Sequence, residues 1–316
     1  MYKFKNSKTV LMLIQVLALM PYLFFIFYLF DLWFDVSRTR VLESNLNDAK
    51  MVSLYLHENI QHGLSLAKTL AYSPDLLDIY REKPESVRKS MRYIVDNNQS
   101  INSIYLVDTE GKILLFESKK LIPKAVGSSV VDMDYFQKIM ATGKSYVSDP
   151  LIGKLAVTNI VTMGEPVLEN GNIKAIVVSA IDIDSLKSQL EKYMSDTGNK
   201  YIYILDRSGS VVFSPFNNID NDLKTSLKNE SFLKEVSKGR EVLLNNRKIP
   251  IMNKTVIGAV VAVNDFQWTV ISIQPTADIF APLFKLQSIT WLVILSSLAF
   301  SLLIISYYIK KIKYII

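Results

Sequence analysis

The chain contains 316 residues, of which 49% are hydrophobic and 21% charged, and its formal net charge at pH 7 is +6. It has no cysteine, which excludes disulfide bonds and cysteine-ligated metal sites. Between residues 35 and 285 no basic run is interleaved with aromatic residues, so the positive charge does not indicate a nucleic-acid-binding protein. The mean hydropathy of +0.20 is high for a soluble protein, which indicates that apolar residues are concentrated locally.

The apolar residues are concentrated at the two ends of the chain. Val10–Phe30 and Ile289–Ile309 are each free of charged residues over 21 positions. An α-helix rises about 1.5 Å per residue and needs about 20 residues to cross a bilayer. We therefore predict transmembrane helices over residues 10–34 and 286–309. The first is expected to be a retained anchor, because its apolar run exceeds that of a signal peptide and no small-residue cleavage site follows it.

Lysines flank the outer ends of both predicted spans. They are Lys3, Lys5, Lys8, Lys310, Lys311 and Lys313. Positive charge favours the cytoplasmic side, so residues 1–9 and 310–316 are predicted to be cytoplasmic tails. The opposite ends carry Arg38, Arg40 and Lys285, which makes the bias modest. The chain is thus expected to cross the inner or plasma membrane twice, in contact with its lipid, and to place residues from about 35 to 285 outside the cytoplasm.

A long amphipathic helix is predicted over residues 35–72, directly after the first span. Its apolar residues recur at steps of three or four and form one stripe. The stripe comprises Leu42, Leu46, Ala49, Val52, Leu56, Ile60, Leu64, Ala67 and Leu70. Such a helix is a stalk, whose stripe packs on the chain's own domains or on a twin stalk in a homodimer. Both interpretations stay open, and a homodimer is the expected assembly.

Two similar segments follow the stalk and predict a duplicated domain. The segment "SIYLVDTEGKILLFES" begins at Ser103 and recurs from Tyr201 as "YIYILDRSGSVVFSPF", at an offset of 98. Each indicates a strand, a turn that contains Asp108 or Asp206, and a second strand. A further hairpin follows each copy, with turns at "ENGN" and "NDFQ". We therefore predict two antiparallel-sheet domains, at residues 73–190 and 191–284.

The stretch at residues 133–186 resembles a known family. It reads "MDYFQKIMATGKSYVSDPLIGKLAVTNIVTMGEPVLENGNIKAIVVSAIDIDSL". Together with the spans, the stalk and the repeat, it resembles the double Cache sensor region of bacterial transmembrane receptors, over about residues 36–280. The resemblance implies an α+β fold, in which two tandem PAS-like antiparallel-sheet domains follow a long N-terminal stalk helix and two transmembrane helices flank them. The first domain would be membrane-distal and the second membrane-proximal.

The resemblance also implies a function: a sensor that binds a small molecule in the membrane-distal domain and signals across the membrane. Such sensors belong to chemoreceptors, histidine kinases and diguanylate cyclases. Members that bind amino acids hold the ligand carboxylate with an arginine two positions before an aromatic pair, and here that position is Met133, before Tyr135 and Phe136. The aspartate for the ligand's amino group would fall at Ala180 or Asp182. A ligand other than a free α-amino acid is therefore expected, because Met133 cannot bind a carboxylate bidentately.

Six polar residues are candidates for the ligand-binding pocket. They are Tyr135, Tyr146, Asp149, Thr158, Ser179 and Asp182. The resemblance places Tyr146 and Asp149 in a loop that covers the pocket. The hydroxyl and carboxylate groups of this set can donate and accept the hydrogen bonds that orient a small molecule.

Each of these candidates also has a purely structural interpretation. Tyr135 would pack in the core, and Asp149 would form a turn before the following proline. Asp182 ends a predicted strand and would cap the next helix. Thr158 and Ser179 would be outward-facing residues of strands. The sequence alone leaves these alternatives open.

No pattern in the chain indicates an enzyme. G-x-S-x-G, HExxH, P-loop and kinase signatures are missing, and Asp108 and Asp206 fit turns better than a catalytic pair. The two histidines, His57 and His62, are five residues apart on the stalk, which places them on different helix faces and disfavours a shared metal. Neither a metal nor a cofactor is therefore expected, and any catalytic output domain would lie beyond residue 316.

A second class of function stays open beside the sensor. The chain would then be an accessory or structural membrane protein without an output of its own, whose exported domain binds another protein. A pocket with converging polar groups favours the sensor, and a filled domain with an apolar outer patch favours the accessory protein. The chain ends in "SYYIKKIKYII", which fits either a piece of a longer receptor or a complete protein.

Overall fold

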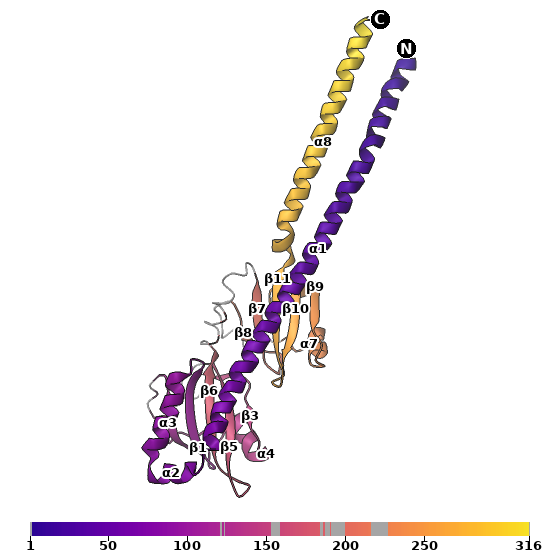
Figure 1. The fold of residues 1–316 in the computed structure, drawn as a ribbon. Coiled ribbons are helices and arrows are strands. Elements are labelled where there is room, and N and C mark those ends of the chain that lie inside the picture. Colours follow the sequence, from indigo (N-terminus) through magenta and orange to yellow (C-terminus); the bar gives the residue numbers. More distant parts are fainter. Residues whose placement is uncertain are drawn as a thin grey trace.

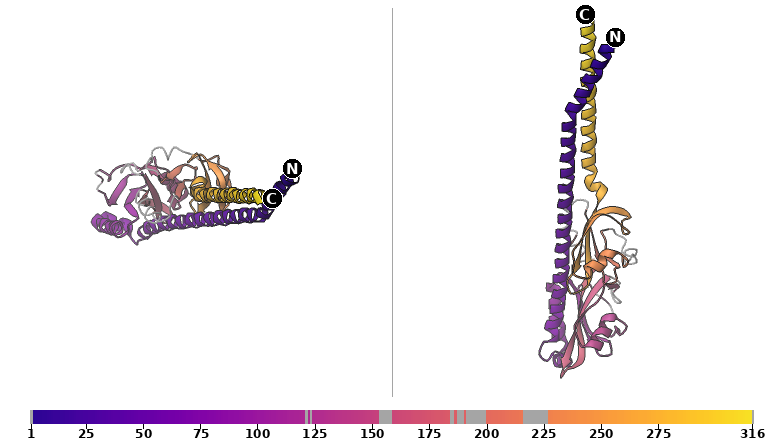
Figure 2. Two further views of the ribbon diagram at one scale, coloured as in Figure 1. Left: turned by 90° about the horizontal axis from the view of Figure 1, so that it is seen from above. Right: turned by 90° about the vertical axis from the view of Figure 1, so that its right-hand side faces the viewer.

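Two long helices extend from one end of a pair of sheet domains (Figure 1). The computed structural model describes residues 2–120, 122, 124–152, 159–183, 186, 190, 200–215 and 227–315. Helix α1 spans Tyr2–Ala71 and helix α8 spans Thr276–Ile315. Both contain a stretch that is long and apolar enough to cross a membrane. The two chain termini lie at the same end of the molecule, away from the sheets (Figure 2).

The predicted stalk stripe is the buried face of α1. Its residues from Ala49 to Leu70 are at most 8% exposed, and they join both sheets in one apolar core. Asn45, beside this stripe, is also fully buried. Its Oδ1 accepts a hydrogen bond from the Ser272 hydroxyl at 2.9 Å, which links α1 to the strand that contains Ser272. α1 therefore packs on the chain's own sheets, whereas the homodimer stays a prediction.

The distal sheet lies at the end of the molecule farther from the termini (Figure 1). Its strand order is β2-β1-β6-β5-β3, and β4 also pairs with β5. The strands are β1 Ile101–Asp108, β2 Ile113–Ser118, β3 Tyr146–Val147, β4 Leu151–Ile152, β5 Asn159–Glu169 and β6 Asn172–Asp182. One face packs with α1, α2 (Leu76–Glu82) and α3 (Pro84–Asn97), and the other face packs with α4 (Asp134–Thr142).

The proximal sheet contains five strands in the order β8-β7-β11-β10-β9. The strands are β7 Tyr201–Leu205, β8 Val211–Phe213, β9 Val242–Ile249, β10 Lys254–Val263 and β11 Trp268–Pro275. α1 packs on one face of this sheet, and the short helix α7 (Ser231–Val236) packs on the other. Every strand pair in the two sheets is antiparallel.

The two sheets have matching strand orders, which confirms the predicted duplication. β1 and β2 correspond to β7 and β8, and β5 and β6 correspond to β10 and β11. The turns also match. Asp108 Oδ1 accepts hydrogen bonds from the backbone N–H groups two and four residues later at 2.9 and 2.8 Å, and Asp206 Oδ1 does so at 2.8 and 2.9 Å. Both aspartates are turn formers, as predicted.

The proximal domain connects directly to the second long helix. β11 ends at Pro275 and α8 begins at Thr276. Phe34 of α1 stacks on Phe280 of α8, with ring centroids 4.4 Å apart. The chain thus enters and leaves the two domains at the same end. The predicted boundary between the domains, at residues 190 and 191, adjoins residues 191–199, which lie outside the described residues, so it stays a prediction.

Candidate ligand-binding site

The candidate site is the face of the distal sheet that α4 covers. Side chains alternate between the two faces along a strand. On β6 the α4 face carries Ile176, Val178, Ala180 and Asp182. The first two pack with Tyr135 of α4 in an apolar cluster. The face therefore changes from apolar to polar along β6, and Asp182 is at its C-terminal end.

Tyr105 of β1 and Tyr135 of α4 meet in the apolar part of this face. Both side chains are buried, and the Tyr105 hydroxyl donates a hydrogen bond to Tyr135 Oη at 3.0 Å. Burial raises the pKa of both hydroxyls, so both stay neutral at physiological pH. Tyr135 is thus packed in the core, as its structural interpretation expects, and its contact with a ligand stays a prediction.

The pairing of these hydroxyls predicts a non-additive effect of mutation. Tyr105→Phe and Tyr135→Phe should each lower the free energy of unfolding by about 1–3 kcal/mol, because each leaves the other hydroxyl buried without its partner. The double variant should lose no more than either single variant. Denaturant unfolding of the full chain in detergent micelles, followed by circular dichroism, measures the losses. Tyr93→Phe, at an exposed position, should be neutral, and additive losses would contradict the pairing.

Thr162 of β5 lies at the polar end of the same face. It is fully buried and pairs in register with Ala180, next to Asp182. Gly164, two residues along β5, faces Ile139 of α4. Within the described part of the chain, Thr162 Oγ1 has no hydrogen-bond partner, which is rare for a buried hydroxyl. The sequence analysis missed Thr162, because a threonine within a buried strand has no distinguishing pattern.

The structure brings only some of the predicted residues onto this face. Asp182 ends β6 and is 4% exposed. Ser179 lies on the opposite face, where its hydroxyl donates to the carbonyl oxygen of Gly63 in α1 at 2.8 Å. The sheet therefore separates Ser179 from Tyr135, and Ser179 is fully buried, so its interpretation as an outward-facing residue is wrong. Thr158 lies outside the described residues.

Tyr146, in the two-residue strand β3, and Asp149 lie in the segment between α4 and β4, which we call the α4–β4 loop. Both residues have partners. The Tyr146 hydroxyl donates to Asp134 Oδ2, at the start of α4, at 2.7 Å. Asp149 Oδ1 accepts from Trp268 Nε1 at 3.2 Å, and Arg207 Nη1 lies 3.6 Å from its Oδ2. Burial raises the pKa of the Asp149 carboxyl, and the Arg207 guanidinium opposes this rise. Trp268 and Arg207 belong to the proximal domain, so this loop joins the two domains.

The two histidines contact different parts of the molecule. His57 Nδ1 lies 3.2 Å from the carbonyl oxygen of Asn264, in the proximal domain. His62 Nε2 lies 2.7 Å from Asn98 Oδ1, in the distal domain. Among the residues that the structure describes, no group of three or more histidine, aspartate or glutamate side chains is placed to hold a metal ion.

A family model of the Cache domain matches residues 36–283, most of the chain. The chain belongs to the Cache domain family. The match confirms the resemblance drawn from the sequence. It also agrees with the fold, because two α+β sheet domains follow one long helix.

Similar proteins include sensory domains of receptors and a kinase. Sporulation kinase D of Bacillus subtilis (strain 168) is 25% identical over 167 residues, which are 52% of this chain and 31% of the kinase, so the chain spans about a third of this relative. The periplasmic sensory domain of the Campylobacter jejuni chemoreceptor Tlp1 has a TM-score of 0.62 at 15% identity, over 78% of this chain and 99% of that domain. The ligand-binding domain of the Campylobacter jejuni chemoreceptor Tlp3, solved in complex with 4-methylisoleucine, has a TM-score of 0.56 at 15% identity, over 77% and 94% of the two chains. These structural likenesses show the fold of the Cache domain.

Proposed function

We propose that this Cache domain protein is a membrane-anchored sensor that binds a small molecule in its distal domain and transmits the signal across the membrane. The observation that carries the proposal is the continuity of α1. One helix packs on the sheet that holds the candidate site, passes the proximal sheet and continues into the apolar end of the chain. A change at the distal sheet therefore has a direct route to the span. The output domain would belong to a longer receptor or to a partner protein.

The proposed ligand site is the polar end of the α4 face. Thr162 and Asp182 supply a hydroxyl and a carboxylate on the sheet, and Tyr146 and Asp149 lie in the adjoining loop. These groups suit a ligand that carries hydrogen-bond donors. Met133 stands at the arginine position of amino-acid-binding members and packs against the apolar cluster of α4. The proposed ligand is therefore not a free α-amino acid.

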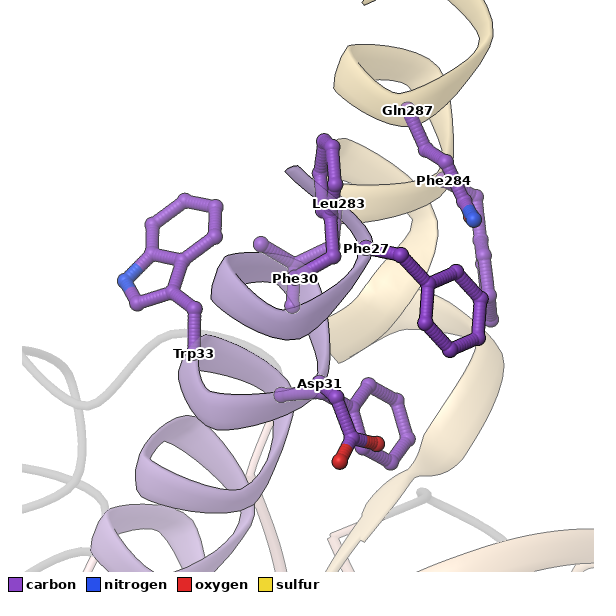
Figure 3. Close-up of a pocket in the computed structure, with 8 residues that line it drawn as sticks. Phe27, Phe30, Asp31, Trp33, Leu283, Phe284 and Gln287 are labelled. Carbon is purple, nitrogen blue, oxygen red and sulfur yellow. The ribbon is translucent and has the colours of Figure 1, made fainter. Parts of the chain in front are cut away.

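The proposed topology places both termini in the cytoplasm and residues 35–285 outside it. The common direction of the two long helices supports this topology (Figures 1 and 2). Near the sheets, a hollow of about 190 Å³ lies between the two helices, and Figure 3 shows aromatic rings from both around it. Its lining is Phe27, Phe30, Asp31, Trp33, Phe34, Leu283, Phe284 and Gln287. Aromatic residues favour the membrane–water interface, so we place the extracytoplasmic membrane surface at this level, where lipid contacts the exposed rings.

A thermal-shift screen of the full chain in lipid nanodiscs tests the binding proposal. The library contains organic acids, amines, sugars and purines. A compound present at about 100 times its Kd stabilises the folded state by about 2.7 kcal/mol, which raises the Tm by about 5–10 °C for domains of this size. Asp182→Asn should abolish that shift. Asp78→Asn, at an exposed acid of α2, is the matched control and should retain it.

The proposed binding site is wrong if Asp182→Asn and the wild type respond alike to every active compound. A library without any active compound would instead favour the accessory-protein function.

One observation supports the accessory-protein function: a hollow of about 290 Å³ at the tip of the distal domain, between the end of α1, the start of α2 and β5. Tyr72 and Leu168 beside it are exposed, so this surface offers apolar contacts to another protein.

A further inference from the structure

The turn between β7 and β8 repeats the turn between β1 and β2 but differs in the two residues between its aspartate and its glycine. Asp108 and Asp206 hold the two turns by the same pair of backbone hydrogen bonds, and the glycine three residues later has a φ of +80° in both. The residue after the aspartate is Thr109 in the first turn and Arg207 in the second. The backbone of the turn is therefore conserved between the copies, while Arg207 adds a long cationic side chain to the second.

Arg207 uses all three nitrogens of its guanidinium, and they reach both domains. Nε donates to the carbonyl oxygen of Phe266 in the proximal domain at 3.1 Å. In the distal domain, Nη2 donates to the carbonyl oxygen of Val147 at 2.8 Å and Nη1 donates to Tyr146 Oη at 3.1 Å. The guanidinium also lies over the Tyr146 ring, 5.4 Å from its centroid. The planar guanidinium group of an arginine can donate to these separate acceptors at the same time, whereas the ammonium group of a lysine cannot.

The distal acceptors of Arg207 belong to the loop that borders the candidate site. Tyr146 is tied to the start of α4 by its hydrogen bond to Asp134. The Ser148 N–H donates to the carbonyl oxygen of Thr162 at 2.9 Å, and Ser148 Oγ accepts from the Thr162 N–H at 3.0 Å. A displacement of this loop would therefore move the surroundings of Thr162.

The proximal acceptor of Arg207 is in contact with α1. The Phe266 ring lies 5.6 Å from the His57 ring of α1, measured between centroids. The loop of the distal domain, the turns of the proximal domain and the long helix thus meet in one cluster around Arg207.

We infer that Arg207 is a positioning residue for the candidate ligand site. From the proximal domain, it fixes the loop that carries Tyr146 and Asp149 in the distal domain. This inference rests on the proposed function, because it assigns Arg207 to the same site. Since the contacts cross from one domain to the other, a ligand that displaces the loop also changes how the two domains are held together.

Hydrogen–deuterium exchange of the full chain in lipid nanodiscs tests the inference without a ligand. Arg207→Ala should speed the exchange of residues 146–149 by about tenfold, because the loop loses two hydrogen bonds. Residues 176–181 of β6 should keep the wild-type rate, which distinguishes loss of positioning from global unfolding. Arg207→Lys should keep less than half of the protection that Arg207 gives to residues 146–149. This variant is compared with the wild type alone if the alanine variant does not fold.

Two matched controls complete the experiment. Thr109→Ala changes the equivalent position of the first turn, and Arg240→Ala removes an arginine of the proximal domain that is 69% exposed. Both should leave the exchange of residues 146–149 unchanged. Wild-type exchange of this loop in Arg207→Ala, an equal rise in β6, or full protection in Arg207→Lys would overturn the inference. None of these outcomes depends on the thermal-shift screen, so the two proposals fail separately.

Discussion

Replacement of Trp268 by alanine is expected to lower the free energy of unfolding by about 4 kcal/mol, as for other buried aromatic side chains. Trp268 begins β11, is 1% exposed and belongs to the core that α1 shares with both sheets. Its Nε1–H also donates to Asp149 of the distal domain at 3.2 Å. The variant therefore loses core packing and an inter-domain hydrogen bond. Denaturant unfolding of the full chain in detergent micelles, followed by circular dichroism, measures the loss.

Two further variants separate these contributions. Trp268→Phe keeps an aromatic ring but has no N–H group, so it should lose less than half as much stability as Trp268→Ala. Trp291 of α8 is 47% exposed, and Trp291→Ala should change the unfolding free energy by no more than about 0.5 kcal/mol. Equal losses for Trp268→Ala and Trp291→Ala would contradict the burial described above.

Gly258→Ala should lower the free energy of unfolding by about 3 kcal/mol, because the added methyl group has no space. Gly258 lies in β10, and a Cβ there would be 2.1 Å from the carbonyl oxygen of Ser272 and 2.7 Å from Cα of Ile273. Both atoms belong to the backbone of the paired strand β11, which cannot move aside without breaking the ladder. The same unfolding experiment measures this loss.

Gly164→Ala is the matched control for this prediction. Gly164 occupies the corresponding position of β5, 94 residues earlier. A Cβ there would meet the end of the Ile139 side chain at 2.3 Å, and a side chain can rotate away where a backbone cannot. The loss at Gly164 should therefore be less than half of that at Gly258. Equal losses would show that the contact with β11 does not decide the result.

Local patterns in the sequence predicted most of the fold. The stripe of α1 was visible because its side chains from Ala49 to Leu70 form one buried face, and burial requires the helical period. The hairpin turns were visible because they need an aspartate that binds backbone N–H groups and a residue with positive φ. The helical period and the turn residues both involve positions that are close together in the chain, so each gives a recognisable local pattern in the sequence.

The candidate site was less predictable, because it depends on contacts between distant segments. The face that Ser179 occupies follows from strand register, which a one-residue shift would invert, and the β1–β6 pairing contains an irregularity between Ile101 and Ser103. Tyr146 and Asp149 were predicted to lie in one loop over the pocket, which stays a prediction, and their partner Arg207 is about 60 residues away in the chain. No local pattern marks such a pair.

α1 rises about 105 Å as one helix of 70 residues. Its buried face touches strands of both sheets. Neither sheet can slide or twist along this helix by itself without exposing apolar surface to water. Both folded units thus pack on the same helix that forms the apolar N-terminal end of the chain. In the proposed sensor, a small axial shift or rotation of α1 imposed at the distal sheet would therefore be carried along the helix towards its apolar end.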